Sequence, residues 1–180
     1  MLIDADHSGL LVIDVQERLL PHIADWQRLL ENINWLVDVA AKIGVPIAAT
    51  EQYPKGLGHT EGDLAARLPA GCVGEKAQFS CVAAGCLPAL PGGKRRPVVV
   101  CGIDCHVCVQ QTVLELRQQG KEVFVVADAV GSRDPANKAL ALERMRQHGA
   151  EIVSREMVAF EWLRQAGTPL FKEISTRFLR

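Results

Sequence analysis

Apolar residues gather into six short runs along the chain, separated by longer segments with helical spacing. Most runs are continuous rather than alternating, which is typical of strands in a parallel sheet that is covered on both faces. The predicted strands are 10–13, 46–50, 72–75, 98–102, 122–127 and 151–154. This alternation of strands and helices predicts an α/β fold with three layers, α/β/α, around a mostly parallel, Rossmann-like central sheet.

The longest helical pattern runs from residue 26 to residue 43, with Asp25 as the expected N-cap and Gly44 as the expected C-cap. Apolar residues recur at spacings of three and four, so one stripe is expected to face the sheet: Ile23, Trp26, Leu30, Ile33, Val37 and Ala40. Further helices are predicted over 109–119, from Asp134-Pro135 to about Gly149, over 157–165 and over 170–179.

Three residues with chemical potential follow predicted strands. Asp14 ends the first apolar run, Lys76 follows the third, and Cys108 lies where the fourth strand turns into a helix. Sites in such sheets form at the carboxyl ends of strands, so these residues are expected to meet. The start of a helix and a nearby lysine favour the thiolate form of a cysteine. A cysteine thiol, a carboxylate and a lysine ammonium can together hydrolyse an amide. Taken singly, each residue also fits a structural role, as a buried thiol or as a strand-end acid paired with a lysine.

The cysteines allow two other interpretations. Cys105 and Cys108 have the Cys-x-x-Cys spacing of redox motifs, although they do not lie in a βαβ unit near the N-terminus, as a thioredoxin-like protein would require. Cys72, Cys81 and Cys86 could be read as zinc ligands, but they lack a second close pair.

Composition bounds the function classes. The 180 residues fit one domain, 1–180, and the content of 48% hydrophobic and 23% charged residues is ordinary for a globular protein. Twenty basic and 21 acidic residues give a net charge of −1, which offers no basis for binding nucleic acid or a membrane surface. The sequence shows no signal peptide or membrane span, and six cysteines without a secretion signal suggest reduced thiols and a cytoplasmic location.

Three segments, in this order along the chain, resemble the isochorismatase-like cysteine hydrolases. They are 11–16, 76–80 and 102–109. The resemblance implies that Asp14 is the general base, that Lys76 orients it and lowers the thiol pKa, and that Cys108 is the nucleophile. It also implies an oxyanion hole formed by the backbone amides of Asp104 and Cys108, with a cis peptide bond between Ile103 and Asp104.

The loop from Thr50 to Gly58 resembles a poorly characterised branch of that family with a Thr-Glu-Gln-Tyr-Pro sequence. Nicotinamidases carry an Asp and histidines for a metal in this region, whereas here only Glu51 and His59 are present. We therefore predict no metal and no cofactor.

Gln16, Tyr53 and Phe79 follow strand ends or lie beside the catalytic candidates, so they are the expected substrate-binding residues.

These observations predict a metal-independent cysteine hydrolase that cleaves a small-molecule C–N bond, amide or carbamoyl, through a thioester at Cys108. The alternatives are a non-catalytic binding or scaffold protein of the same fold and a thiol redox protein that uses Cys105 and Cys108. A homo-oligomer, a dimer or larger, is expected because the segment 161–180 is rich in apolar residues. These are Trp162, Leu163, Leu170, Phe171, Ile174, Phe178 and Leu179.

Overall fold

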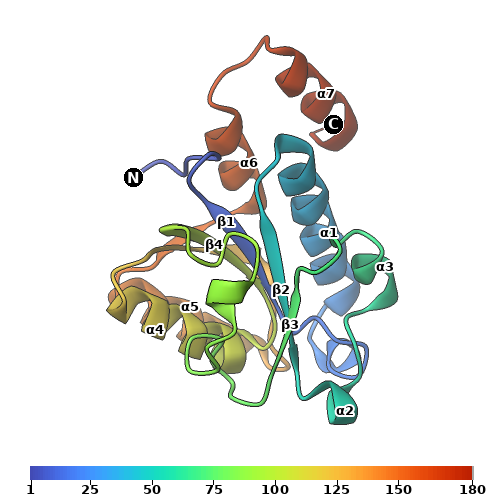
Figure 1. The fold of residues 1–180 in the computed structure, drawn as a ribbon, viewed down its shortest axis with the longest axis vertical. Coiled ribbons are helices and arrows are strands. Elements are labelled where there is room, and N and C mark those ends of the chain that lie inside the picture. Colours follow the sequence, from blue (N-terminus) through green and yellow to red (C-terminus); the bar gives the residue numbers. More distant parts are fainter. Residues whose placement is uncertain (180) are drawn as a thin grey trace.

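A six-stranded sheet lies at the centre of the computed structural model, which describes residues 1–179 (Figure 1). The strands are β1 (Gly9–Ile13), β2 (Ile47–Gln52), β3 (Val73–Lys76), β4 (Pro97–Gly102), β5 (Glu122–Val130) and β6 (Glu151–Val153). Their order across the sheet is β3-β2-β1-β4-β5-β6, and each neighbouring pair is parallel. The prediction of a parallel α/β sheet is confirmed.

Helices cover both faces of the sheet. The helices of four residues or more are α1 (Trp26–Ile43), α2 (Pro54–Leu57), α3 (Gly62–Ala65), α4 (Gln110–Gln118), α5 (Pro135–Gln147), α6 (Arg155–Leu163) and α7 (Pro169–Phe178), with a π-helical turn over Cys105–Val109. Helices α1 and α6 pack together on one face, and α4 and α5 pack together on the other (Figure 1). Helix α7 lies outside this arrangement, against α1. The three-layer prediction is therefore confirmed as well.

The continuous apolar runs are explained by the two cores that the sheet separates. Along β1, Leu10 and Val12 belong to the core beneath α1 and α6, whereas Leu11 and Ile13 belong to the core beneath α4 and α5. Successive side chains of a strand point to opposite faces, so a strand covered on both sides must be apolar at every position.

Helix α1 begins and ends at the predicted residues, but its N-terminus differs in detail. Gly44 ends the helix at a φ of 92°, as a C-cap glycine does. Asp25 precedes the helix at a φ of 52°, and its side chain makes no capping hydrogen bond. The buried stripe is also rotated from the predicted one. Leu29 is buried against Gly131, while Trp26 and Leu30 are only half-buried.

The later helices begin where a side chain caps them. Asp134 accepts a hydrogen bond from the Ala136 amide at the start of α5, as predicted. Helix α6 begins two residues earlier than predicted because Ser154 accepts a hydrogen bond from the Met157 amide and completes its first turn.

Over residues 1–179, no helix has both the length and the apolar character that a bilayer crossing requires.

Candidate active site

The site forms at the carboxyl end of β1, the strand from which the chain builds the sheet outward in both directions, first through β2 and then through β4. Asp14 directly follows β1, whose last residue, Ile13, pairs with Thr50 of β2 and Gly102 of β4. Asp14 is fully buried and has a φ of 52°, a left-handed conformation that aspartate and asparagine tolerate better than most residues.

Gly102 allows the chain after β4 to approach β1. Its φ is 122°, and a Cβ atom at this position would lie 2.1 Å from the carbonyl oxygen of Ile13. Any side chain would therefore push the two strand ends apart. The turn that follows carries Cys108, so this glycine sets the distance between the thiol and Asp14.

Asp14 and Lys76 form a fully buried ion pair. The Lys76 Nζ lies 2.7 Å from the Asp14 Oδ2, and both side chains are shielded from solvent. Thr50 donates a hydrogen bond of 2.8 Å to the other carboxylate oxygen, Oδ1. Both oxygens of Asp14 are thus held by donors, so the carboxylate has one fixed orientation.

Cys108 lies in the π-helical turn between β4 and α4, and its thiol interacts with the Asp14 carboxylate. In this turn the Val109 amide donates to the carbonyl oxygen of Asp104, five residues back, which widens the helix by one residue. Such turns recur at functional sites because they redirect one side chain out of the regular helical path. Here that side chain is the candidate nucleophile.

The electrostatics of the thiol differ from the prediction. Burial raises the pKa of Cys108 well above its ordinary value, and the negative charge of Asp14 raises it further, while the Lys76 ammonium opposes both effects. The helix start and Lys76 therefore do not produce a lowered thiol pKa. The raised pKa favours a neutral thiol beside Asp14, so that the thiolate forms as Asp14 takes the proton.

Burial also raises the pKa of Asp14, and the charge and hydrogen bond of Lys76 oppose this effect. A raised pKa makes a carboxylate a stronger base, while the adjacent ammonium keeps the ionised form accessible.

The backbone next to Cys108 has the features that the family resemblance implied. The peptide bond between Ile103 and Asp104 is cis. Within residues 1–179 the Asp104 amide donates no hydrogen bond, while the Asp104 carbonyl accepts from Val107 and Val109. The Asp104 carboxylate is held 2.9 Å from the Nε of Arg133.

The thiol opens into a pocket of about 490 Å³. The pocket is lined by Leu19, His22, Gln52, Leu57, Phe79, Asp104, Val107, Cys108 and Arg133. Its apolar walls and few polar groups are typical of a small-molecule site, and its volume lies within the range of such sites.

The three expected substrate-binding residues have different positions. Phe79 lines the pocket, and its carbonyl oxygen also accepts a hydrogen bond from Lys76. Gln16 is fully buried outside the pocket lining, because its amide is bound to the backbone of Gln52 and Gly58. Tyr53 is 58% exposed and its ring packs beside Gly56 rather than into the pocket.

The sequence did not identify Thr50 and Gln52, at the end of β2, as residues of the site. Thr50 binds Asp14, and Gln52 accepts a hydrogen bond of 2.6 Å from Lys76. Their spacing of two residues on the strand beside β1 is the signal that could have identified them, because residues i and i+2 of a strand share one face.

The remaining cysteines occupy distinct environments, and all six thiols are free. Cys105 is fully buried in the core beneath α4 and α5, where burial raises its pKa to about 12. Cys86 is half-buried, its Sγ lies 3.5 Å from the carbonyl oxygen of Cys81, and the neighbouring Cys81 side chain lowers the pKa of the Cys86 thiol. Cys86 is therefore the thiol that competes with Cys108 for an alkylating reagent near neutral pH.

Iodoacetamide near neutral pH should label Cys108 and Cys86 before the other four thiols, because Asp14 can take the Cys108 proton and the pKa of Cys86 is lowered. Asp14→Asn should slow the labelling of Cys108 by about tenfold or more, because it removes the proton acceptor, and should leave Cys86 unchanged. Peptide mass spectrometry measures both sites in one sample. Labelling of Cys105 or Cys81 ahead of Cys108 would contradict the assignment of the nucleophile.

Glu51 and His59, considered above for a metal, bind each other. The His59 Nδ1 lies 2.9 Å from one carboxylate oxygen of Glu51, and the other oxygen accepts from the amide and hydroxyl of Thr60. This contact ties the loop after α2 to the end of β2.

Comparison with known proteins identifies the family of this chain. The model of the isochorismatase domain family matches residues 8–157. This chain belongs to the isochorismatase family. Family membership supports a hydrolase.

Relatives within the isochorismatase family extend over nearly the whole chain. The secreted isochorismatase effector Isc1 of Phytophthora sojae is 38% identical over 175 residues, which cover 94% of this chain and 83% of that protein. Among solved structures, the MAR1 ribonuclease from Caenorhabditis elegans is 32% identical with a TM-score of 0.89, covering 100% of this chain and 93% of that one. The YcaC gene product of Escherichia coli, described as an octameric hydrolase of unknown specificity, is 25% identical with a TM-score of 0.86 and covers 92% of this chain and 83% of its own.

Proposed function

We propose that this isochorismatase-family chain is a metal-independent cysteine hydrolase that cleaves a C–N bond, amide or carbamoyl, in a small molecule through a thioester at Cys108. The observation that carries the proposal is the buried Asp14–Lys76 ion pair, 2.7 Å between charged atoms, with the thiol of Cys108 between it and the pocket. Removing two charges from water costs free energy that their attraction repays only in part, so the buried pair supports a role in the reaction.

The proposed first half-reaction forms the thioester. Asp14 accepts the proton of the Cys108 thiol as the sulfur attacks the carbonyl carbon, and the carbonyl oxygen becomes an oxyanion bound by the amides of Asp104 and Cys108. The intermediate collapses, the C–N bond breaks, and the leaving nitrogen takes the proton from Asp14. Lys76 stabilises the carboxylate before the proton transfer and again after Asp14 has given the proton to the leaving nitrogen.

The second half-reaction releases the product. Water attacks the thioester carbon as Asp14 accepts one of its protons, the C–S bond breaks, and the Cys108 thiolate recovers that proton from Asp14. The acyl product leaves as a carboxylic acid, or as a carbamic acid from a carbamoyl substrate. Water is thus the only co-reactant.

Release of ammonia from a panel of small primary amides and carbamoyl compounds tests this reaction. We expect turnover of at least one short compound whose acyl part fits the apolar walls at Leu57, Phe79 and Val107.

EDTA should leave the rate of amide turnover unchanged, because a thiolate attacks the substrate without a metal-bound water. Inhibition by EDTA that zinc or manganese restores would contradict the metal-independent mechanism.

The Caenorhabditis elegans neighbour is named a ribonuclease, so RNA is the second substrate to test, with strand cleavage as the readout. The net charge of −1 and the small pocket give no support to RNA binding. RNA cleavage that Cys108→Ala abolishes, in the absence of amide turnover, would overturn the proposed reaction.

We also propose that the chain works as a homo-oligomer, in the cytoplasm and as one domain. The apolar C-terminal segment supports an oligomer only in part: Trp162, Leu163 and Ile174 are buried within the chain itself. Phe178 packs edge-on against Trp35, with ring centroids 6.4 Å apart. These contacts pack α6 and α7 against α1 within the same chain.

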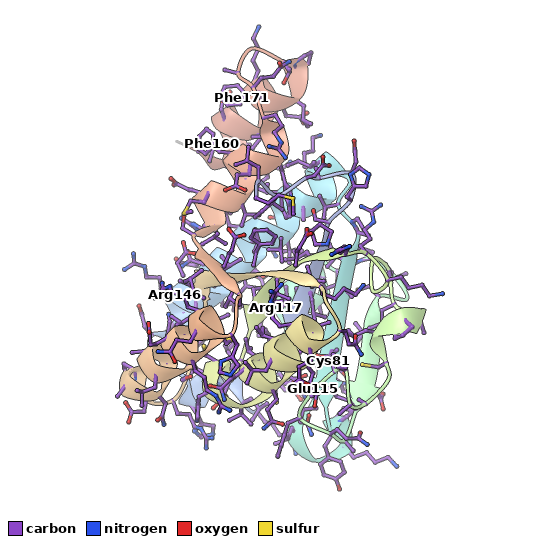
Figure 2. All side chains as sticks on the ribbon, turned by 90° about the vertical axis from the view of Figure 1, so that its left-hand side faces the viewer. Cys81, Glu115, Arg117, Arg146, Phe160 and Phe171 are labelled. Atoms are coloured by element: carbon purple, nitrogen blue, oxygen red, sulfur yellow. The ribbon has the colours of Figure 1, made fainter. Side chains whose placement is uncertain are left out.

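The apolar surface that stays uncovered lies on the adjoining helices α6 and α7. Phe160 is 49% exposed, and its ring lies 6.4 Å from the half-buried Phe171 (Figure 2). Paired aromatic rings at a surface are typical of interfaces.

Phe160→Lys should therefore lower the mass of the assembly at micromolar concentration, as measured by light scattering. The matched control is Leu140→Lys on α5, where the leucine is 70% exposed. A wild-type mass near 19.6 kDa, the mass of one chain, would refute the oligomer. Dissociation by Leu140→Lys alone would instead move the interface to α5.

A further inference from the structure

The Lys76 ammonium is bound by three oxygen atoms in a fully buried position. Its Nζ lies 2.7 Å from the Asp14 Oδ2, 2.6 Å from the Gln52 Oε1 and 2.9 Å from the Phe79 carbonyl oxygen. An ammonium has three donors and no acceptor, so these contacts use its whole capacity. Only one of the three partners is charged.

The Gln52 side chain has a defined orientation. Its Nε2 donates to the Ala77 carbonyl oxygen at 2.6 Å, and its Oε1 faces Lys76. A carbonyl can only accept and an ammonium can only donate, so these two neighbours settle which end of the amide is oxygen.

Gln16 holds the backbone of Gln52 in place. The Gln16 Oε1 accepts from the Gln52 amide at 2.7 Å, and the Gln16 Nε2 donates to the Gln52 carbonyl oxygen at 2.9 Å and to the Gly58 carbonyl oxygen at 2.7 Å. The side chain of Gln16 is fully buried and thus bridges the ends of β1 and β2 with the loop after α2.

The register of the sheet delivers Gln52 to this position. Gln52 of β2 is the direct partner of Lys76 of β3, and both are the last residues of their strands. Thr50 shares the strand face of Gln52, whereas Glu51 binds His59 and Thr60. The end of β2 therefore supplies one neutral partner to each member of the ion pair.

We propose that Gln52, held in place by Gln16, is a positioning residue that keeps Lys76 on Asp14 and reserves the ammonium charge for the reacting groups. The inference rests on the proposed roles of Asp14 and Cys108. A neutral amide satisfies one donor of Lys76 without competing for its charge. A carboxylate at the same place would share the ammonium and add a second negative charge beside Asp14, which makes Asp14 harder to ionise.

The test is the rate at which iodoacetamide alkylates Cys108 as a function of pH, in a Cys86→Ala background that removes the competing thiol. The measurement needs no knowledge of the substrate. The titratable and charged groups around the pair and its pocket come from four segments: Cys108 and Asp104 from the turn after β4, Cys81 and Cys86 from the loop after β3, Arg133 from the segment after β5, and His22 from the segment before α1. The Cys86→Ala background removes the competing thiol, and the part of the acidic limb that Asp14→Asn abolishes reports Asp14.

Gln52→Glu should shift the acidic limb, the low-pH part of the profile where the rate rises with pH, upward by about one pH unit. At a given pH on this limb, alkylation should slow by about tenfold, while the rate at high pH stays within about twofold of the parent. The matched control is Gln78→Glu, which makes the same change on an exposed side chain two residues after Lys76. Solvent screens that charge, so its profile should coincide with the parent's.

Gln52→Met provides a second measurement that does not depend on the folding of Gln52→Glu. It removes the acceptor without adding charge, so Lys76 is held less firmly on Asp14, and alkylation on the acidic limb of the profile should slow by about tenfold. A merely structural Gln52 would lower the melting temperature and leave both profiles on the parent curve, and that result would overturn the inference.

The failure of the proposed function gives a different result. If Cys108 of the parent resists alkylation, or if Asp14→Asn leaves its profile unchanged, the roles of Asp14 and Cys108 are wrong, and the inference falls with them. If the parent profile depends on Asp14 but Gln52→Glu coincides with Gln78→Glu, only the role of Gln52 is wrong.

Discussion

Cys108→Ala is expected to reduce hydrolysis by about 10⁴-fold or more, because no other group near the pocket can form the thioester. Folding should be nearly unaffected, with a loss of about 1 kcal/mol, since the substitution removes one sulfur atom from a turn and breaks no ion pair. Steady-state ammonia release measures the first effect, and thermal or urea unfolding measures the second. The variant should also fail to accumulate an acyl-enzyme of increased mass when it is mixed with a slow substrate.

Cys105→Ala is the matched control, because it makes the same change three residues away, in a side chain packed in the core rather than facing the pocket. We expect this variant to keep most of the activity and to lose about 1 kcal/mol of stability. Equal losses of activity in the two variants would contradict the hydrolase and favour the redox alternative, which requires both thiols. Full activity of Cys108→Ala would exclude the thioester altogether.

Asp14→Asn is the second change with a large expected effect, because it removes the proton acceptor and the counter-ion of Lys76 together. We expect the rate of hydrolysis to fall by about 10²–10⁴-fold, the usual contribution of a general base. The fold should lose about 3–5 kcal/mol, since a buried ammonium is left without its anion. Asparagine tolerates the left-handed backbone of this position, so the loss reports the charge rather than backbone strain.

The double variant Asp14→Asn/Lys76→Met separates the two effects. Removal of both charges should restore most of the stability, because no unpaired ion remains buried, while activity stays lost. Urea unfolding at neutral pH measures the difference between the single and double variants. A single variant as stable as the parent would show that the pair contributes nothing to folding.

The pH dependence follows from the same pair. Burial raises the pKa of Asp14, and the reaction needs this carboxylate ionised to take the thiol proton. Activity should therefore rise with pH through that raised pKa. At higher pH the thiol persists, because burial also raises the pKa of Cys108.

Much of the fold was predictable from the sequence, for a reason visible in β1. A strand with helices on both faces must be apolar at every position, so its run of apolar residues is unambiguous in the sequence. The order of the predicted strands and helices followed, and with it the place of Asp14, Lys76 and Cys108 at strand ends. Helix α1 was predicted to the residue because Gly44 ends it with a conformation that glycine favours.

The details of the site depended on the tertiary structure, because they depend on which way a side chain points and how deeply it is buried. Gln16 and Tyr53 both come after strand ends, yet one is buried in backbone hydrogen bonds and the other faces solvent. The apolar residues of the C-terminal segment look alike in the sequence, and only the packing of α7 against α1 decides that Ile174 is buried and that Phe171 stays partly exposed.

The sequence by itself determined which residues could react, since the kind of side chain and its place after a strand are local properties. The protonation of the thiol was decided only by the tertiary structure. A helix start beside a lysine predicts a lowered pKa, but burial and the Asp14 charge act in the opposite direction and prevail. Thr50 and Gln52 reach the site from β2 because parallel pairing aligns the ends of three strands, a relation between segments that are distant along the chain. Desolvation and partners across strands arise only when such segments pack together, so the folded chain alone specifies them.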